Sequence, residues 1–128
     1  MEVRLADCAG FCFGVKRAVD TVYEQLKNGK TIYTYGPIVH NEEVVRELSE
    51  KGVRVLENKE ELKHLKAGEN IPTVIIRAHG VAKEIYDIME ANGLECIDAT
   101  CPFVKKIHRI VEQKSTEGYH VIVVGDPK

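Results

Sequence analysis

The fold is decided by residues 73–97, TVIIRAHGVAKEIYDIMEANGLECI. They begin with a solid β-branched run over 73–77, which is typical of a strand buried on both faces of a parallel sheet. Apolar side chains then recur at helical spacing, and Asn92-Gly93 supplies a helix stop signal. These side chains are Val81, Ile85, Ile88 and Met89. A second apolar run follows over 94–97, so the stretch predicts a strand, a helix and a strand.

The same alternation extends in both directions along the chain. Further strands are predicted at residues 3–8, 31–35, 53–56 and 120–124. Further helices are predicted at residues 14–27, between Asn41 and Gly52, at 59–65 and at 102–114. Asn41 and Asn58 are each placed to cap the helix that follows. Because helical connections of this kind bring successive strands parallel, the sequence predicts an α/β fold of βαβ units with a mainly parallel sheet.

Length and charge exclude several classes of protein. The chain has 128 residues, which fits one compact domain or one domain with a piece of a second. Its 18 basic and 20 acidic residues leave a net charge of −2, which argues against a nucleic-acid binder that must neutralise phosphates. No window approaches the roughly 18 apolar residues of a membrane span, and the start lacks the features of a signal peptide. We therefore expect a cytoplasmic protein with neither nucleic-acid nor membrane partners.

Two of the four cysteines occupy positions suited to chemistry. A cytosolic chain is not expected to carry a disulfide framework. Cys12 lies between two glycines, and Cys101 directly precedes Pro102, so both are predicted in strand-to-helix turns. The positive end of a helix favours the thiolate, which is the form that attacks and that binds metal. Cys8 and Cys96 fall in predicted strands and are interpreted as ordinary buried residues.

Three chemistries compete for Cys12 and Cys101. A structural zinc site usually takes closely spaced cysteine pairs, which the chain lacks. A thiol phosphatase needs an arginine that closes the loop after its cysteine, but the residues six positions on are Ala18 and Ile107. An iron–sulfur cluster needs only thiolates that converge in space, although it requires at least one further ligand. The spacing therefore fits an iron–sulfur site best.

Two of the five histidines are candidate anion ligands. His40 and His79 each follow an apolar strand and precede a helix start, where free N–H groups and the helix dipole attract anions. An imidazole that donates hydrogen bonds makes each turn a candidate phosphate or diphosphate clamp. His108 lies seven residues beyond Cys101 and could face the same cleft, whereas His64 lies in a charged stretch and is expected to be solvated.

Four sequence blocks, taken together, resemble the 4-hydroxy-3-methylbut-2-enyl diphosphate reductase family. They are Gly10-Phe11-Cys12-Phe13-Gly14, Val39-His40-Asn41, Ala78-His79-Gly80-Val81 and Asp98-Ala99-Thr100-Cys101-Pro102. The resemblance implies an oxidoreductase of the last step of the non-mevalonate isoprenoid pathway. Its iron–sulfur cluster, usually 4Fe–4S, would remove a hydroxyl group to give isopentenyl and dimethylallyl diphosphates. The electrons would come from a ferredoxin- or flavodoxin-type donor.

The resemblance also implies roles for individual residues. Cys12 and Cys101 would be cluster ligands, and His40 and His79 would bind the diphosphate of the substrate. Family members are much longer and contain three pseudo-symmetric α/β domains. By this match residues 1–97 form the first domain, and 98–128 supply the opening helix and strand of a truncated second domain.

No catalytic residue is assigned within the chain, because the family's proton donor and third cysteine are expected beyond Lys128. The chain alone is therefore expected to be inactive. Two other functions remain open from the residues themselves. One is a small-anion-binding module that uses His40 and His79 without redox chemistry. The other is a cysteine-based sulfur or phosphoryl transferase.

Overall fold

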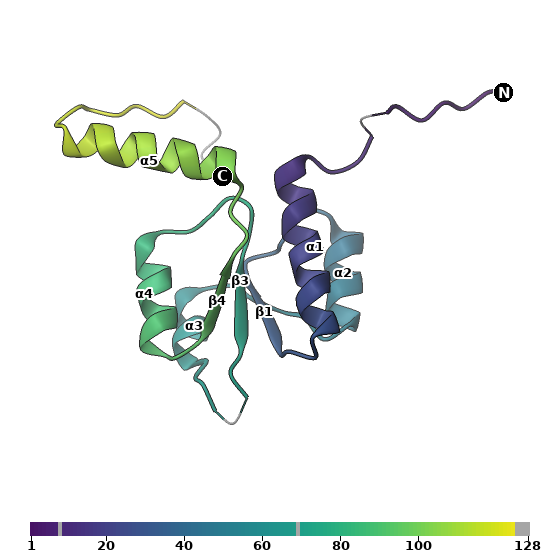
Figure 1. Cartoon of the computed structure of the whole chain (residues 1–128), viewed down its shortest axis with the longest axis horizontal. Coiled ribbons are helices and arrows are strands. Elements are labelled where there is room, and N and C mark those ends of the chain that lie inside the picture. Colours follow the sequence, from purple (N-terminus) through teal and green to yellow (C-terminus); the bar gives the residue numbers. More distant parts are fainter. Residues whose placement is uncertain (8, 69, 125–128) are drawn as a thin grey trace.

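A four-stranded parallel sheet forms the centre of the molecule, as a computed structural model that describes residues 1–7, 9–68 and 70–124 shows (Figure 1). Its strands are β1 (Ile32–Tyr35), β2 (Arg54–Leu56), β3 (Thr73–Ile76) and β4 (Glu95–Asp98). They follow the order β2-β1-β3-β4, and every neighbouring pair is parallel. The helices of this part of the chain are α1 (Phe13–Lys27), α2 (Glu42–Glu50), α3 (Lys59–His64), α4 (Lys83–Ala91) and α5 (Pro102–Thr116). The predicted α/β fold is confirmed.

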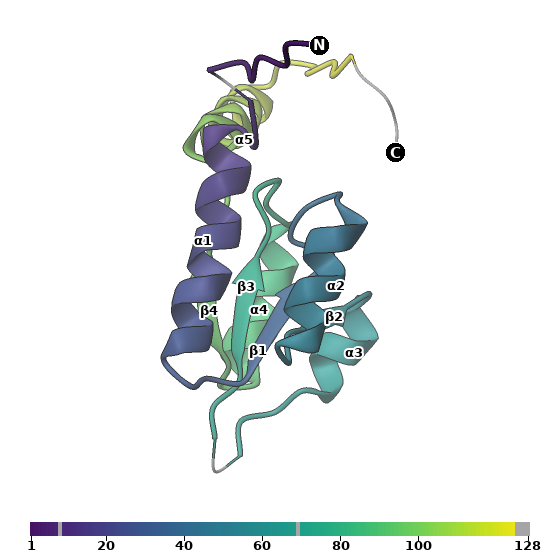
Figure 2. The same ribbon diagram turned by 90° about the vertical axis from the view of Figure 1, so that its right-hand side faces the viewer.

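Helices cover both faces of the sheet, because the central strand is apolar on both sides. Helices α1 and α2 lie against one face, and α3 and α4 lie against the other (Figures 1 and 2). Ile75 of β3 packs into the core of the first face, and Val74 and Ile76 pack into that of the second. All three side chains are fully buried, as expected for a strand of a doubly covered parallel sheet.

Two asparagine caps fix where helices α2 and α3 begin. The side-chain oxygen of Asn41 accepts a hydrogen bond of 3.1 Å from the N–H of Val44 at the start of α2. Asn58 accepts one of 3.0 Å from the N–H of Glu61 in α3. Such a cap stabilises a helix by about 1 kcal/mol. The cap at Asn41 also positions His40, which directly precedes it.

Two predicted strands are wrong. Residues 1–7 form no strand, and Val3 and Leu5 are 82% and 86% exposed. Cys8, the last residue of that prediction, lies outside the described residues. Residues 120–124 also form no strand, and Ile122 is 85% exposed. Apolar runs become strands only when a neighbouring strand satisfies their backbone groups, and neither run has such a partner within the described residues.

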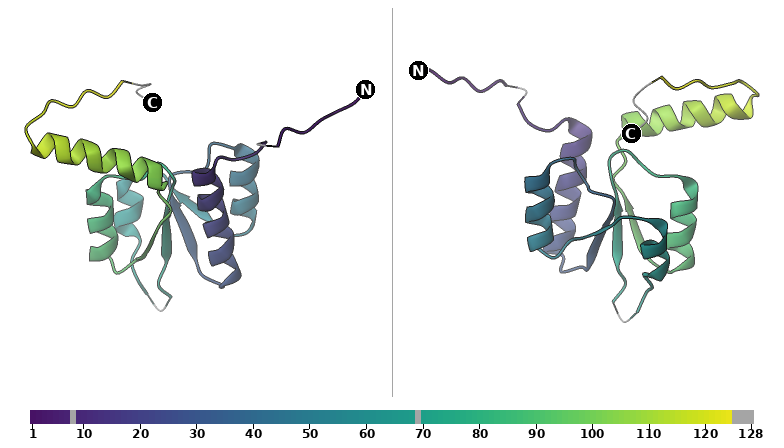
Figure 3. Two further views of the ribbon diagram at one scale, coloured as in Figure 1. Left: turned by 45° about the horizontal axis from the view of Figure 1, so that its top comes forward. Right: turned by 180° about the vertical axis from the view of Figure 1, so that it is seen from behind.

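Helix α5 forms as predicted, but its apolar face is uncovered. None of its residues is buried, and Phe103 is 69% exposed. Figure 3 shows α5 running away from the sheet on the side of α4. The assignment of residues 98–128 to a second domain stays a prediction. Within the described residues, no helix is both long enough and apolar enough to span a bilayer.

Candidate functional site

The candidate site lies where the strand order of the sheet changes direction, between β1 and β3. β1 and β3 are neighbours in the sheet, but β1 leads into α2 on one face while β3 leads toward α4 on the other (Figure 1). The loops that leave the carboxyl ends of the two strands therefore diverge. In open α/β sheets, ligands bind in the crevice at this point. His40 lies on the first loop and His79 on the second.

The structure brings the two predicted histidines together. The ring centroids of His40 and His79 are 5.6 Å apart, with an angle of 57° between the ring planes. Both residues are exposed, so a ligand can reach them. The pKa of His79 lies below its ordinary value. The main cause is partial burial, followed by the positive charge of Arg77 and the neighbouring His40. His64 lies elsewhere, exposed on α3 with its Nδ1 2.6 Å from the carbonyl oxygen of Glu60.

A glycine lets α5 approach the turn that holds His79. Gly80 has a φ of 75°, which lies in the left-handed region that favours glycine. A Cβ atom at this position would lie 2.9 Å from Cε1 of His108 and 3.1 Å from Cγ2 of Thr100. His108 therefore lies close to the turn that holds His79.

The two candidate thiols lie at the same edge of the molecule. Cys12 is the N-cap residue of α1, and Cys101 is the N-cap residue of α5. Gly14 is buried against Cys101, because a Cβ on Gly14 would lie 2.7 Å from the Cys101 Sγ. Arg17 donates a hydrogen bond of 3.1 Å to the carbonyl oxygen of Thr100, which also ties α1 to the turn before α5.

A backbone hydrogen bond joins the turn that holds Cys101 to the turn that holds His79. The N–H of Cys101 donates a hydrogen bond of 2.9 Å to the carbonyl oxygen of Ala78, the residue before His79. Burial by itself would raise the pKa of the Asp98 carboxyl. Hydrogen bonds from Lys105 and Thr100 have the larger combined effect, so the pKa of Asp98 lies below its ordinary value. The charged Asp98 in turn accepts a hydrogen bond of 2.9 Å from the Thr100 N–H, which fixes the turn before Cys101.

Gly14→Ala is expected to destabilise the chain by about 1–3 kcal/mol, because the added methyl group overlaps the Cys101 side chain. The better helix propensity of alanine returns at most about 1 kcal/mol of this. Urea unfolding followed by circular dichroism measures the change. Gly68→Ala is the matched control, since nothing lies within 4 Å of its Cβ position. Equal stability of the two variants would contradict the contact between α1 and Cys101.

Cys12 and Cys101 do not by themselves complete a metal site within the described residues. Within residues 1–7, 9–68 and 70–124, no three metal-binding side chains gather at one point. Cys12 is exposed and Cys101 half-buried, and neither side chain makes a helix-capping hydrogen bond. Two such thiols at one edge fit an iron–sulfur cluster as two of its ligands, but a cluster needs about three or four protein ligands.

The other two cysteines do not join this group. Cys96 lies in a strand as predicted, but the expectation that it is buried is wrong, because β4 is an edge strand and the Cys96 residue is exposed. The pKa of the Cys96 thiol is raised, mainly by partial burial and then by the Asp98 carboxylate. The raised pKa disfavours the thiolate form. Cys8 lies outside the described residues.

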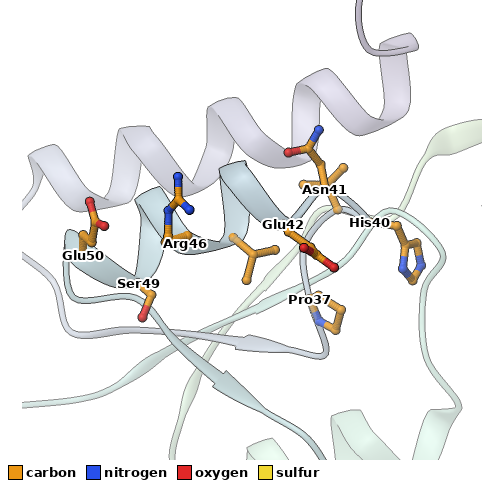
Figure 4. Close-up of a pocket in the computed structure, with 9 residues that line it drawn as sticks. Pro37, His40, Asn41, Glu42, Arg46, Ser49 and Glu50 are labelled. Carbon is orange, nitrogen blue, oxygen red and sulfur yellow. The ribbon is translucent and has the colours of Figure 1, made fainter.

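Sequence reasoning missed two features near the histidines. The first is Arg77, which follows β3 directly and lowers the pKa of His79. The sequence could have indicated this arginine, because Arg77 lies between a buried strand and Ala78-His79-Gly80. The second is a hollow of about 630 Å³ along α2 (Figure 4). His40 lies at one end of this hollow, apart from Ser49 and Glu50 at the other, so the hollow extends away from the histidine pair.

These features define an α/β protein with imidazole and thiol groups gathered at the carboxyl edge of a parallel sheet. The chain belongs to the LytB protein family, whose model matches residues 3–128. The 4-hydroxy-3-methylbut-2-enyl diphosphate reductase of Caldanaerobacter subterraneus subsp. tengcongensis is 51% identical over 128 residues, which cover 98% of this chain and 43% of that protein. The reductase of Clostridioides difficile is 42% identical over 129 residues, covering 100% of this chain and 44% of that protein.

Solved structures agree with these relatives. A structure of (E)-4-hydroxy-3-methyl-but-2-enyl diphosphate reductase, described as the terminal enzyme of the non-mevalonate pathway, matches with a TM-score of 0.77 and 45% identity. The match covers 94% of this chain and 41% of that chain. The Plasmodium falciparum reductase matches with a TM-score of 0.76 and 37% identity, over 88% of this chain and 34% of that chain. The chain thus spans less than half the length of these proteins, and the family resemblance of its sequence blocks is confirmed.

Proposed function

We propose that this chain is the amino-terminal part of a 4-hydroxy-3-methylbut-2-enyl diphosphate reductase, which forms isopentenyl and dimethylallyl diphosphates. One observation carries the proposal. The loops after β1 and β3 bring His40 and His79 together, and the N–H of Cys101 donates a hydrogen bond to the carbonyl oxygen of the residue before His79. An anion-binding pair and a metal-binding thiol thus share one edge of the sheet. Sequence identity of 51% to a reductase relative supports the same activity.

In this proposal Cys12 and Cys101 would hold a 4Fe–4S cluster as two of its ligands, and a further ligand would come from outside the described residues. When bound, the cluster supplies the electrons for reductive loss of the hydroxyl group. Gly14 and Arg17 hold α1 against the turn before α5, so that the two thiols stay at one edge. A ferredoxin- or flavodoxin-type protein is the proposed electron donor, and the cytoplasm the proposed location.

His40 and His79 bind the diphosphate of the substrate. Each neutral imidazole offers one N–H donor, and a protonated one offers two. The lowered pKa of His79 reports that its cationic form is disfavoured in the free chain. A diphosphate placed between the rings supplies the missing negative charge, so binding favours the protonated, doubly donating form. The adjacent helix start at Asn41 adds backbone N–H groups that attract the same anion.

His40→Ala and His79→Ala are each expected to weaken substrate binding by about 10- to 150-fold, because one hydrogen bond to a charged group contributes about 1.5–3 kcal/mol. The cluster absorption should change little, because neither ring is a proposed iron ligand. Calorimetric titration of the substrate into a protein of full family length that contains these residues measures the loss. His64→Ala is the control and should leave both properties unchanged. Unaltered substrate affinity in both test variants would refute the assignment.

A second function remains, a small-anion-binding module without redox chemistry. It is favoured by one observation, namely that the two histidines meet while the described residues bring fewer thiols together than a cluster needs. Anaerobic addition of iron and sulfide to a protein of full family length that contains these residues separates the two functions, because only a reductase gains visible absorption from thiolate-to-iron charge transfer.

A further inference from the structure

The side chain of Arg77 reaches from the loop after β3 to the loop after β1. It directly follows β3, and its guanidinium group lies over Gly36, which directly follows β1. A Cβ on Gly36 would lie 3.0 Å from the Arg77 Nη1. Gly36 has a φ of 70°, so the bare backbone is required both by the turn and by the close approach of the guanidinium. The side chain of Arg77 therefore spans the two strands from which the histidine loops depart.

Arg77 is a half-buried cation whose charge no ion pair balances within the described part of the chain. Within the described residues, no carboxylate forms an ion pair with Arg77, and its buried Nε–H has no hydrogen-bond partner. An unpartnered buried donor is unfavourable, and native proteins seldom retain one without a use for it. Several other cations of the described residues do form ion pairs, such as Lys30 with Glu95 and Arg46 with Glu43. Arg77 thus has unused hydrogen-bonding capacity beside the histidine pair.

We propose that Arg77 is a third anion-binding group of this crevice and donates hydrogen bonds to the same diphosphate as His40 and His79. The inference rests on the proposed function and adds a residue to its binding site. A guanidinium group presents a planar fork of donors that matches two phosphate oxygens at once. Its partial burial strengthens this contact, because less water competes for the charge. The influence of Arg77 on the pKa of His79 agrees with their proximity.

The three groups recognise a dense anion together. In the free chain, Arg77 and the histidines repel one another when the imidazoles are protonated. A diphosphate relieves this repulsion, whereas orthophosphate, which carries fewer negative charges, relieves less of it. We therefore expect Arg77 to increase the preference of the site for pyrophosphate over orthophosphate.

Calorimetric titration of inorganic pyrophosphate into the 128-residue chain tests the proposal. Arg77→Gln should weaken binding by about tenfold or more, the effect of losing one charge-assisted hydrogen bond. Arg77→Lys, which keeps the charge but loses the fork, should fall between the wild type and Arg77→Gln. Arg54→Gln is the matched control, because it removes the same charge from an exposed position at the amino end of β2, on the opposite edge of the sheet. It should change affinity by less than about twofold.

The outcomes for the Arg77 and histidine variants distinguish a failure of the Arg77 inference from a failure of the proposed histidine site. Equal weakening by Arg77→Gln and Arg54→Gln would indicate a general charge effect and overturn the inference. Loss of binding in His40→Ala and His79→Ala with full binding in Arg77→Gln would also overturn it, yet leave the proposed histidine site intact. Weakening by Arg77→Gln alone would support Arg77 and refute the histidines. A wild-type chain that binds no pyrophosphate would overturn both.

Discussion

Replacing Cys12 or Cys101 by serine is expected to remove nearly all cluster iron from a protein of full family length that contains these residues. The thiolate is the form that binds iron, and a serine hydroxyl does not replace it. Each cysteine is one of about three protein ligands in the proposed site, so a single loss leaves too few ligands to hold a cluster. Iron and acid-labile sulfide per chain, measured after anaerobic reconstitution, report the effect.

The other two cysteines provide matched controls for this prediction. Cys96→Ser removes an exposed thiol from the edge strand β4, and Cys8→Ser removes one to which no role is assigned. Both variants should keep wild-type iron content. Equal iron loss from all four substitutions would show that Cys12 and Cys101 have no special role.

The 128-residue chain alone is expected to show no measurable formation of isopentenyl or dimethylallyl diphosphate. Its two candidate thiols are fewer than the ligands that hold a cluster stably. Loss of a hydroxyl group also needs a positioned acid, which typically contributes about 10²–10⁴-fold to the rate, and no residue of this chain is assigned that role. We expect turnover to fall by well over about 10⁴-fold, since the electron source and the acid are both affected.

Product assays with the purified chain, iron, sulfide and a strong reductant under anaerobic conditions check this expectation. A reductase of full family length, prepared in the same way, is the positive control. Turnover by the 128-residue chain close to that of the control would mean that the catalytic groups are misassigned.

Much of the fold could be predicted because its signals are local. Asn41 and Asn58 mark helix starts through bonds to N–H groups three residues ahead, and such spacing is visible in a sequence. The buried β-branched run of β3 likewise identifies itself as a central parallel strand. The meeting of His40 and His79 followed from topology, since the carboxyl ends of parallel strands lie at one edge of a sheet.

The wrong predictions concern properties that depend on distant partners. Residues 3–8 and 120–124 have strand-like side chains, but side chains alone do not supply the neighbouring strand that a ladder requires. Cys96 is exposed because β4 is an edge strand, and strand order is not written in local periodicity. The contact of Arg77 with Gly36 joins segments that are distant in the sequence, so only the assembled sheet reveals it.

Visible absorption after anaerobic reconstitution tests the central claim most directly. The claim is that the thiols and the histidine pair at one sheet edge belong to an iron–sulfur reductase. A protein of full family length that contains these residues should gain a thiolate-to-iron charge-transfer band when iron and sulfide are added, and Cys101→Ser should abolish that band. A protein that binds pyrophosphate yet never develops the band would be an anion-binding module, and this result would contradict the account.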